Sequence, residues 1–125
     1  MAGVVRSLGP DVPVIEVVVE GSMTDPDTME LVTSGMRMQH EQGYLLGLVD
    51  ATRLTQKATP ALVIQVADHL RDAGVPDGWR QAVLRPRDLD AAMAVDLWEA
   101  AANNRGLAVK VFRDRDQALA WLLAD

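Results

Sequence analysis

The sequence contains no cysteine and very few aromatic residues. The absence of cysteine from its 125 residues excludes a disulfide scaffold, a thiolate zinc site, an iron–sulfur centre and a cysteine nucleophile. Because aromatic residues make up only 4 % of the chain, the core must be built from aliphatic side chains and methionine. The longest apolar run, from Ala118 to Ala124, corresponds to about two helical turns and is far too short to span a bilayer.

Basic residues are also too few for a protein that binds nucleic acid. The 12 Lys and Arg residues are outnumbered by 18 Asp and Glu, so the net charge is -6, which disfavours nucleic acid and anionic membranes as partners. The N-terminus has no apolar run of signal-peptide length, because Arg6, Pro10 and Pro13 interrupt it. We therefore expect one bacterial-type cytoplasmic domain over residues 1–125, large enough to fold without a metal or a disulfide.

Strand-length apolar runs alternate with helix-length segments along the chain. The apolar runs predict strands over residues 3–8, 14–20, 45–49, 80–85 and 107–112. Helices are predicted from 24–27 to 43, from 60 to about 73, from 88 to about 104, and from 114 onwards. The order β-β-α-β-α-β-α-β-α indicates an α/β fold, with an N-terminal β-hairpin followed by four β-α units and a mainly parallel sheet.

Capping residues set the boundaries of these helices. Thr24 or Asp25 can cap the first helix, Thr59 caps the second, and Asp88 caps the third. Gly43 fits a left-handed stop after the first helix. The inward faces are predicted to carry Met29, Val32, Thr33 and Met36 in the first helix, and Leu62, Val63, Val66 and Leu70 in the second.

Most of the predicted strands alternate between apolar and polar residues. In residues 14–20, for example, Ile15, Val17 and Val19 oppose Glu16 and Glu20. This alternation is typical either of edge strands or of a sheet with one face less covered than the other.

No catalytic motif is present. The sequence has no phosphate-binding glycine loop, no nucleophile elbow and no zincin helix. Its two histidines, His40 and His69, are predicted near helix C-termini, where an imidazole interacts well with the helix dipole. We therefore expect a protein without enzymatic activity, without catalytic residues, and without a metal or cofactor.

The segment 88–104 is a first candidate site because apolar residues cover well over half of its circumference. A helix that packs on a sheet by one face needs a stripe of only about 100°. The excess, which includes Met93, Val95, Leu97 and Trp98, must be covered by something. Neighbouring helices, a homodimer interface and an apolar ligand pocket are the alternatives.

The segment 50–60 is a second candidate site. It leaves the C-terminal end of a central strand and enters a helix N-terminus, where open α/β sheets bind ligands and anions. Its polar side chains could hold a phosphate, a carboxylate or a partner protein, or could simply form a loop with a capping threonine. These side chains are Asp50, Thr52, Arg53, Thr55, Lys57 and Thr59.

Several short motifs resemble a known superfamily. The run Leu48-Val49-Asp50 resembles the strand of STAS domains that ends in an aspartate. The C-terminal third carries Arg85-Pro86-Arg87-Asp88-Leu89, then Val109-Lys110-Val111-Phe112-Arg113-Asp114, then Ala118-Leu119-Ala120-Trp121-Leu122. Together these motifs resemble small stand-alone bacterial proteins of the SpoIIAA-like superfamily, which takes in STAS domains and shares its broad name with the CRAL-TRIO lipid-binding type of fold.

The resemblance implies a sheet wound with helices and a non-enzymatic role in regulatory protein–protein interaction. The alternative is an apolar small-molecule or lipid-binding module with a pocket beside the 88–104 helix. In anti-sigma-factor antagonists of this superfamily, a partner kinase phosphorylates a serine at the position that Thr59 takes here. Because Ala58 and Pro60 depart from the pattern around that serine, we expect Thr59 to be a helix cap and not a phosphorylation site.

Overall fold

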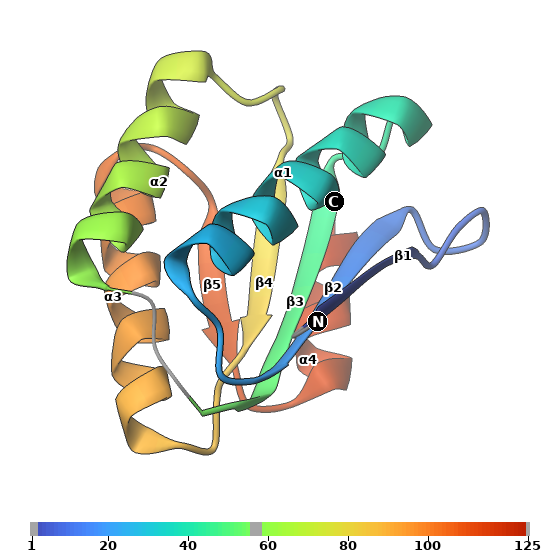
Figure 1. Cartoon of the computed structure of the whole chain (residues 1–125). Helices are drawn as coiled ribbons and strands as arrows, with labels where there is room; N and C mark the ends of the chain where they lie inside the picture. Colours follow the sequence, from blue (N-terminus) through green and yellow to red (C-terminus); the bar gives the residue numbers. More distant parts are fainter. Residues whose placement is uncertain (1–2, 56–58, 125) are drawn as a thin grey trace.

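The structure, a computed structural model, describes residues 3–55 and 59–124 and has the predicted α/β architecture (Figure 1). The elements run in the order β1 (Gly3–Ser7), β2 (Val14–Gly21), α1 (Asp25–Gln42), β3 (Leu46–Leu54), α2 (Pro60–Ala73), β4 (Arg80–Leu84), α3 (Leu89–Asn104), β5 (Val109–Phe112) and α4 (Arg115–Leu123). The strands form one sheet in sequence order. β1 pairs with β2 in antiparallel fashion, and the remaining pairs are parallel, which confirms the predicted hairpin and mainly parallel sheet.

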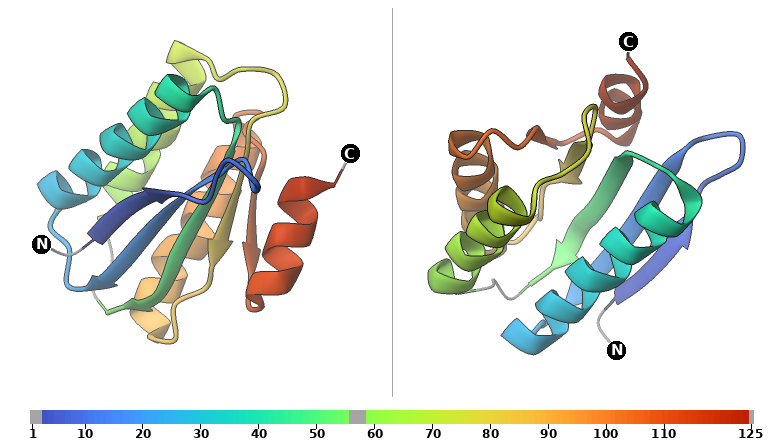
Figure 2. Two further views of the ribbon diagram at one scale, coloured as in Figure 1. Left: turned by 90° about the vertical axis from the view of Figure 1, so that its right-hand side faces the viewer. Right: turned by 90° about the horizontal axis from the view of Figure 1, so that it is seen from above.

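The helices cover the two faces of the sheet unequally. α1, α2 and α3 lie on one face, and α4 lies on the other (Figure 2). α1 packs along β1 and β2, α2 packs against α3, and α4 covers β3, β4 and β5. One face of the sheet is therefore less covered than the other, but the alternating polar residues do not mark it as exposed, because Glu16 is buried on the α4 face and Gln81 lies on the face covered by three helices.

The capping residues place α1 and α2 where the sequence predicts them. Thr24 caps α1 by accepting a hydrogen bond from the backbone N–H of Asp27, whose carboxylate accepts in return from the backbone N–H of Thr24. Gly43 takes the left-handed conformation at the end of α1. The sequence predicts Thr33 on the inward face of α1, and this prediction is wrong because Thr33 is exposed. The helix packs on only one edge of the sheet, so its buried stripe is narrower than predicted.

β3 is longer than predicted. The sequence predicts a strand that ends at Val49 and a loop from Asp50, whereas β3 continues to Leu54. The reason lies in the partner strand, because β2 extends to Gly21 and pairs with Leu54 at that end. A strand that has a neighbour over its whole length keeps its hydrogen bonds, even where its residues are polar.

The α4 face contains a buried ion pair that the sequence does not reveal. Glu16 of β2 is fully buried beneath α4 and accepts hydrogen bonds from Arg6 of β1 and Arg115 of α4. The two guanidinium groups compensate the buried carboxylate, which would otherwise be costly to remove from water. This triad joins β1, β2 and α4 around a small core that also holds Leu48 and Leu122.

Candidate functional site: an apolar cavity

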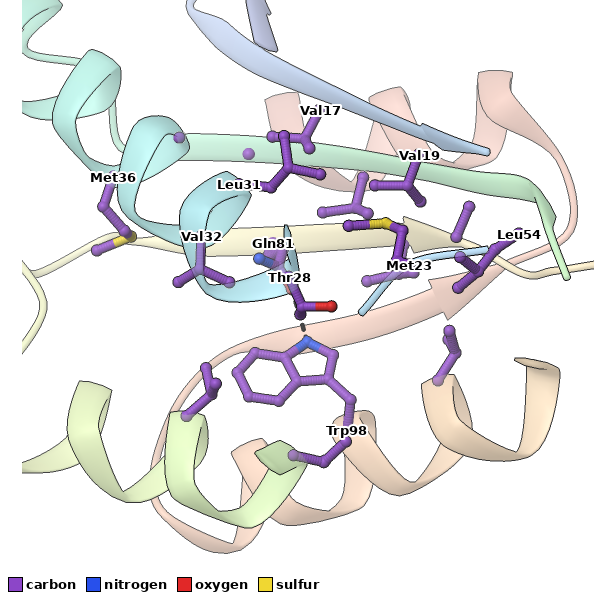
Figure 3. Close-up of a pocket in the computed structure, with 18 of the residues that line it drawn as sticks. Val17, Val19, Met23, Thr28, Leu31, Val32, Met36, Leu54, Gln81 and Trp98 are labelled. Carbon is purple, nitrogen blue, oxygen red and sulfur yellow. Dashed lines mark hydrogen bonds between the residues drawn. The ribbon is translucent and has the colours of Figure 1, made fainter. Parts of the chain in front are cut away.

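An apolar cavity of about 200 Å³ lies between the sheet and helices α1, α2 and α3. β2 contributes Val17 and Val19 to its wall, while α1 and α3 supply the opposing sides. Figure 3 shows Val32 and Met36 of α1 facing Trp98 of α3 across this space. The cavity therefore lies at the centre of the more heavily covered face of the sheet.

The cavity exists because α1 and the α2–α3 pair rest on different parts of the sheet. α1 approaches β2 closely at Gly35, where an added Cβ would lie 3.3 Å from Val17 Cγ2. Farther across the sheet, the lining residues Gly47 and Ala51 have little or no side chain with which to fill the gap. As a result Val49, in the central strand, is only half-buried, whereas its paired neighbour Val83 is 2 % exposed.

The lining of the cavity is uncharged among the residues that the structure describes, and its polar members are Thr28, Gln39 and Gln81. The indole Nε1 of Trp98 donates a hydrogen bond of 2.7 Å to Gln81 Oε1 (Figure 3). The hydroxyl of Thr28 donates to a backbone carbonyl within α1. Gln39 is 8 % exposed, and its side-chain Nε2 has no hydrogen-bond partner.

Polar bonds between α3 and the sheet fix the orientation of Trp98. The carboxylate of Glu99 accepts from the backbone N–H of Val111, and Asn103 Nδ2 donates to the carbonyl of Val109. On the same side of α3, about one turn before Glu99, Asp96 forms an ion pair of 3.0 Å with Arg85, which follows β4. The hydrogen bond from Arg85 to Asp96 raises the pKa of that guanidinium above its usual value. The polar side of α3 is therefore directed at β4 and β5.

A further ion pair holds α2 and α3 together as one wall of the cavity. Arg105, at the C-terminus of α3, donates from Nε to the carboxylate of Asp68 on α2 at 2.7 Å. This hydrogen bond is the main cause of a lowered pKa for the Asp68 carboxyl, and the nearby charges of Arg105 and Arg71 add to it.

The structure separates the α3 residues that the sequence singles out. Val95 and Trp98 line the cavity, whereas Met93 is on the solvent side of the helix and is 63 % exposed. Leu97 is half-buried and lies outside the lining formed by the described residues. The wide apolar surface of α3 therefore divides into a part that lines the cavity, a part that packs on neighbours, and an exposed part.

The polar residues of the second candidate site, the segment 50–60, do not form one group, because β3 extends into this segment as far as Leu54. Thr52 donates from its backbone N–H and its hydroxyl to the carboxylate of Asp50, and Arg53 forms an exposed ion pair of 3.7 Å with Glu20. Asp50, Thr52 and Arg53 also line a polar depression of about 320 Å³, together with Arg87. This depression is outside the apolar cavity, and acidic groups already pair with part of its positive charge.

The remaining residues of that segment do not join this group. Thr55 follows β3 and donates its backbone N–H to the carbonyl of Gly21, and Lys57 lies outside the described residues. Thr59 caps α2 by accepting from the backbone N–H of Leu62, which confirms the predicted cap. Its hydroxyl also donates to a carboxylate oxygen of Asp25 at 3.0 Å, so the N-termini of α1 and α2 are linked.

Sequence reasoning missed the contribution of α1 to the cavity, and Gln39 in particular. A signal was present, because Gln39 follows Met36 by three residues and therefore lies on the apolar side of the helix. A glutamine in such a stripe is either paired or directed at an occupant.

Within residues 3–55 and 59–124, no helix is both long and apolar enough to cross a membrane. In the same residues, no group of three or more His, Asp or Glu side chains could hold a metal ion.

No protein-family model matches the chain, and no curated protein matches its sequence. A solved structure shows that the chain has a SpoIIAA-like fold, which is the fold that the motifs in the sequence imply. The chain is similar in structure to an uncharacterized DUF3478-family protein with a SpoIIAA-like fold from Shewanella loihica PV-4. The TM-score is 0.58 and the sequence identity 16 %, over 97 % of this chain and 92 % of that one. At this identity the likeness concerns the fold alone.

Proposed function

We propose that the protein binds a small apolar molecule in the cavity between α1 and the α2–α3 pair. The observation that carries the proposal is an uncharged, mainly aliphatic cavity of about 200 Å³ within the described core, large enough to leave Val49 half-buried in the central strand. The cavity is partly open to solvent, so it is a cleft between the helices and the sheet rather than a closed internal void. Small-molecule sites are concave and lined mainly by apolar side chains with a few polar groups, and this lining has that character.

The volume limits the size of the ligand. An apolar cavity of about 150 Å³ holds a benzene molecule, so about 200 Å³ accommodates about eight non-hydrogen atoms. Pockets for drug-sized ligands are larger, at about 300–1,000 Å³. A single ring or a short chain fits this cavity better than a complete membrane lipid.

The proposed role is non-enzymatic. The cavity lining in the described chain holds no carboxylate, histidine or lysine that could transfer a proton. Such a lining supports reversible binding of a ligand, which would act by changing the protein surface or its binding to a partner protein.

The test is binding of a defined apolar probe, ethylbenzene, by wild-type protein and two variants. Val49→Phe places a ring in the cavity, while Val4→Phe adds the same ring on β1, where Val4 is 53 % exposed. At a probe concentration of about 100 times Kd, we expect wild type and Val4→Phe to gain about 2.7 kcal/mol of stability. Val49→Phe should remain folded and gain none. An equal gain in all three proteins would place the probe elsewhere, and no gain in wild type would refute the proposal.

Regulatory protein–protein interaction is the second candidate function, and one surface feature favours it. Leu89 and Met93 are 75 % and 63 % exposed and lie one turn apart on α3, on the side away from the cavity. A homodimer would cover them. If it forms, sedimentation at high micromolar concentration should show a dimer that Met93→Asp dissociates, with ethylbenzene binding unchanged. A wild-type protein that remains monomeric would rule out the homodimer.

A further inference from the structure

The cavity has one polar end. Gln39, near the C-terminus of α1, lies over the beginning of β3, where a Cβ added to Gly47 would be 3.6 Å from Gln39 Nε2. Gly47 pairs with Gln81 in the adjacent strand, so both glutamines border the same end of the cavity. At the far end of β3 the lining includes Leu54, Met23 and Thr28 (Figure 3), and the hydroxyl of Thr28 already donates to a carbonyl at the start of the same helix.

One hydrogen-bond donor at this polar end is unused. The oxygen of Gln81 already accepts from Trp98, whereas Gln39 Nε2 has no partner although the residue is 8 % exposed. A buried donor without a partner costs free energy that a bound acceptor recovers. Trp79 Nε1 is also buried and unpaired, but Trp79 does not belong to the described lining of the cavity.

The glycine beneath this donor leaves space for an acceptor. Glycine inside a strand weakens the strand, and it often marks a place where a ligand approaches the backbone. A methyl group at Gly47 would meet Gln39 Nε2 at an ordinary contact distance of 3.6 Å and would fill the space beside the donor. In the wild-type chain that space is open to a ligand atom.

We propose that the ligand is a neutral carbonyl compound with a short apolar chain. Its carbonyl oxygen accepts a hydrogen bond from Gln39 Nε2 above Gly47, and its chain extends along β3 towards Leu54. The carbonyl is neutral because the described lining offers no cation, and burying an unpaired carboxylate or phosphate is far more costly than burying a neutral group. This inference rests on the proposed function and specifies the ligand of the same cavity.

The test compares two probes of the same shape, 2-heptanone and 2-methyl-1-heptene, in which a CH₂ group replaces the carbonyl oxygen. Both Kd values are measured for wild type, for Gln39→Met and for the control Gln65→Met, an exposed glutamine on α2. The indole N–H signal of Trp98 reports binding in the cavity. The readout is the ketone-to-alkene ratio of affinities, because this ratio cancels changes in stability and in general packing.

We expect Gln39→Met to lower this ratio by about two- to tenfold and Gln65→Met to leave it unchanged, since a net hydrogen bond contributes about 0.5–1.5 kcal/mol. Gly47→Ala should lower the ratio as well, because its methyl group takes the place of the oxygen. The unliganded Gln39→Met protein should be at least as stable as wild type, because the substitution removes an unpaired donor.

The outcomes separate this inference from the proposed function. If both probes bind and neither substitution changes the ratio, the cavity binds apolar ligands but Gln39 does not select a carbonyl group. If ionised heptanoate binds more tightly than the ketone, the ligand is not neutral. If neither neutral probe binds or shifts the Trp98 signal, the proposed function fails together with the inference.

Discussion

Replacing Val49 with isoleucine tests directly whether the space above the central strand is free. Val49 is in a row of paired valines that also contains Val17 and Val83, and it faces the cavity. Isoleucine adds one methylene and keeps the β-branched side chain that suits a strand. If the methylene enters the cavity, it contributes about 0.8 kcal/mol of apolar burial.

We therefore expect Val49→Ile to raise the free energy of unfolding by about 0.8 kcal/mol and Tm by about 3 °C. Denaturant unfolding at equilibrium measures the first quantity, and the slope m should not change. The matched control is Val109→Ile in β5, because Val109 is 3 % exposed and packs in the same core outside the cavity lining. Overpacking should make that control less stable by about 1–3 kcal/mol.

If Val49→Ile and Val109→Ile lower the free energy of unfolding equally, the prediction is wrong. In that case no room for a methylene exists above Val49, and neither the proposed ligand nor its orientation could be retained. A stabilised Val49→Ile protein that also binds ethylbenzene more weakly would support both the space and its use.

Two further predictions concern polar contacts between the helices. Thr59→Ala should lower the free energy of unfolding by about 1 kcal/mol through loss of the α2 cap. Thr59→Asp keeps a capping side chain but places a second carboxylate beside Asp25, so this variant should also be less stable than wild type. Added salt should reduce the loss of stability, because salt screens the repulsion between the two carboxylates. A Thr59→Asp protein as stable as wild type at low salt would contradict the prediction. Arg105 lowers the pKa of the Asp68 carboxyl in the folded state. The contribution of the Asp68–Arg105 pair to folding stability is therefore present above the unfolded-state pKa of 3.8, and it is lost as the pH falls below that value. Asp68→Asn should therefore reduce the difference between the free energies of unfolding at about pH 6 and about pH 3, as measured by denaturant unfolding. The control Asp77→Asn, which replaces an exposed carboxylate, should leave this difference unchanged.

Local features of the sequence were sufficient to predict the secondary structure and the topology. Thr59 and Asp88 start helices because their side chains accept from free backbone N–H groups, an interaction that needs only neighbouring residues. Leu62 and Leu70 face inward as their spacing requires. Helices between successive strands demand parallel pairing, so the sheet follows from the order of the elements.

Features that depend on a partner strand or helix were decided only by the tertiary structure. The sequence predicted that the strand after Tyr44 ends at Val49, yet it continues to Leu54 because β2 is long enough to pair with it. Glu16 reads as a solvent-facing residue of an alternating strand, yet it is fully buried because α4 supplies Arg115. Neither partner is adjacent in sequence.

The cavity itself belongs to the tertiary structure for the same reason. Hydrophobic periodicity shows which side of a helix or strand is apolar, but it does not show how closely the opposing element approaches. The wide apolar surface of α3 indicated that Trp98 and Val95 need a covering, and the sequence left helices, a dimer and a ligand as alternatives. In the tertiary structure α1 packs on β2 while α2 packs on α3, and this arrangement leaves a space between α1 and the α2–α3 pair. Gln39 lies at one end of this space, and its side-chain Nε2 has no hydrogen-bond partner.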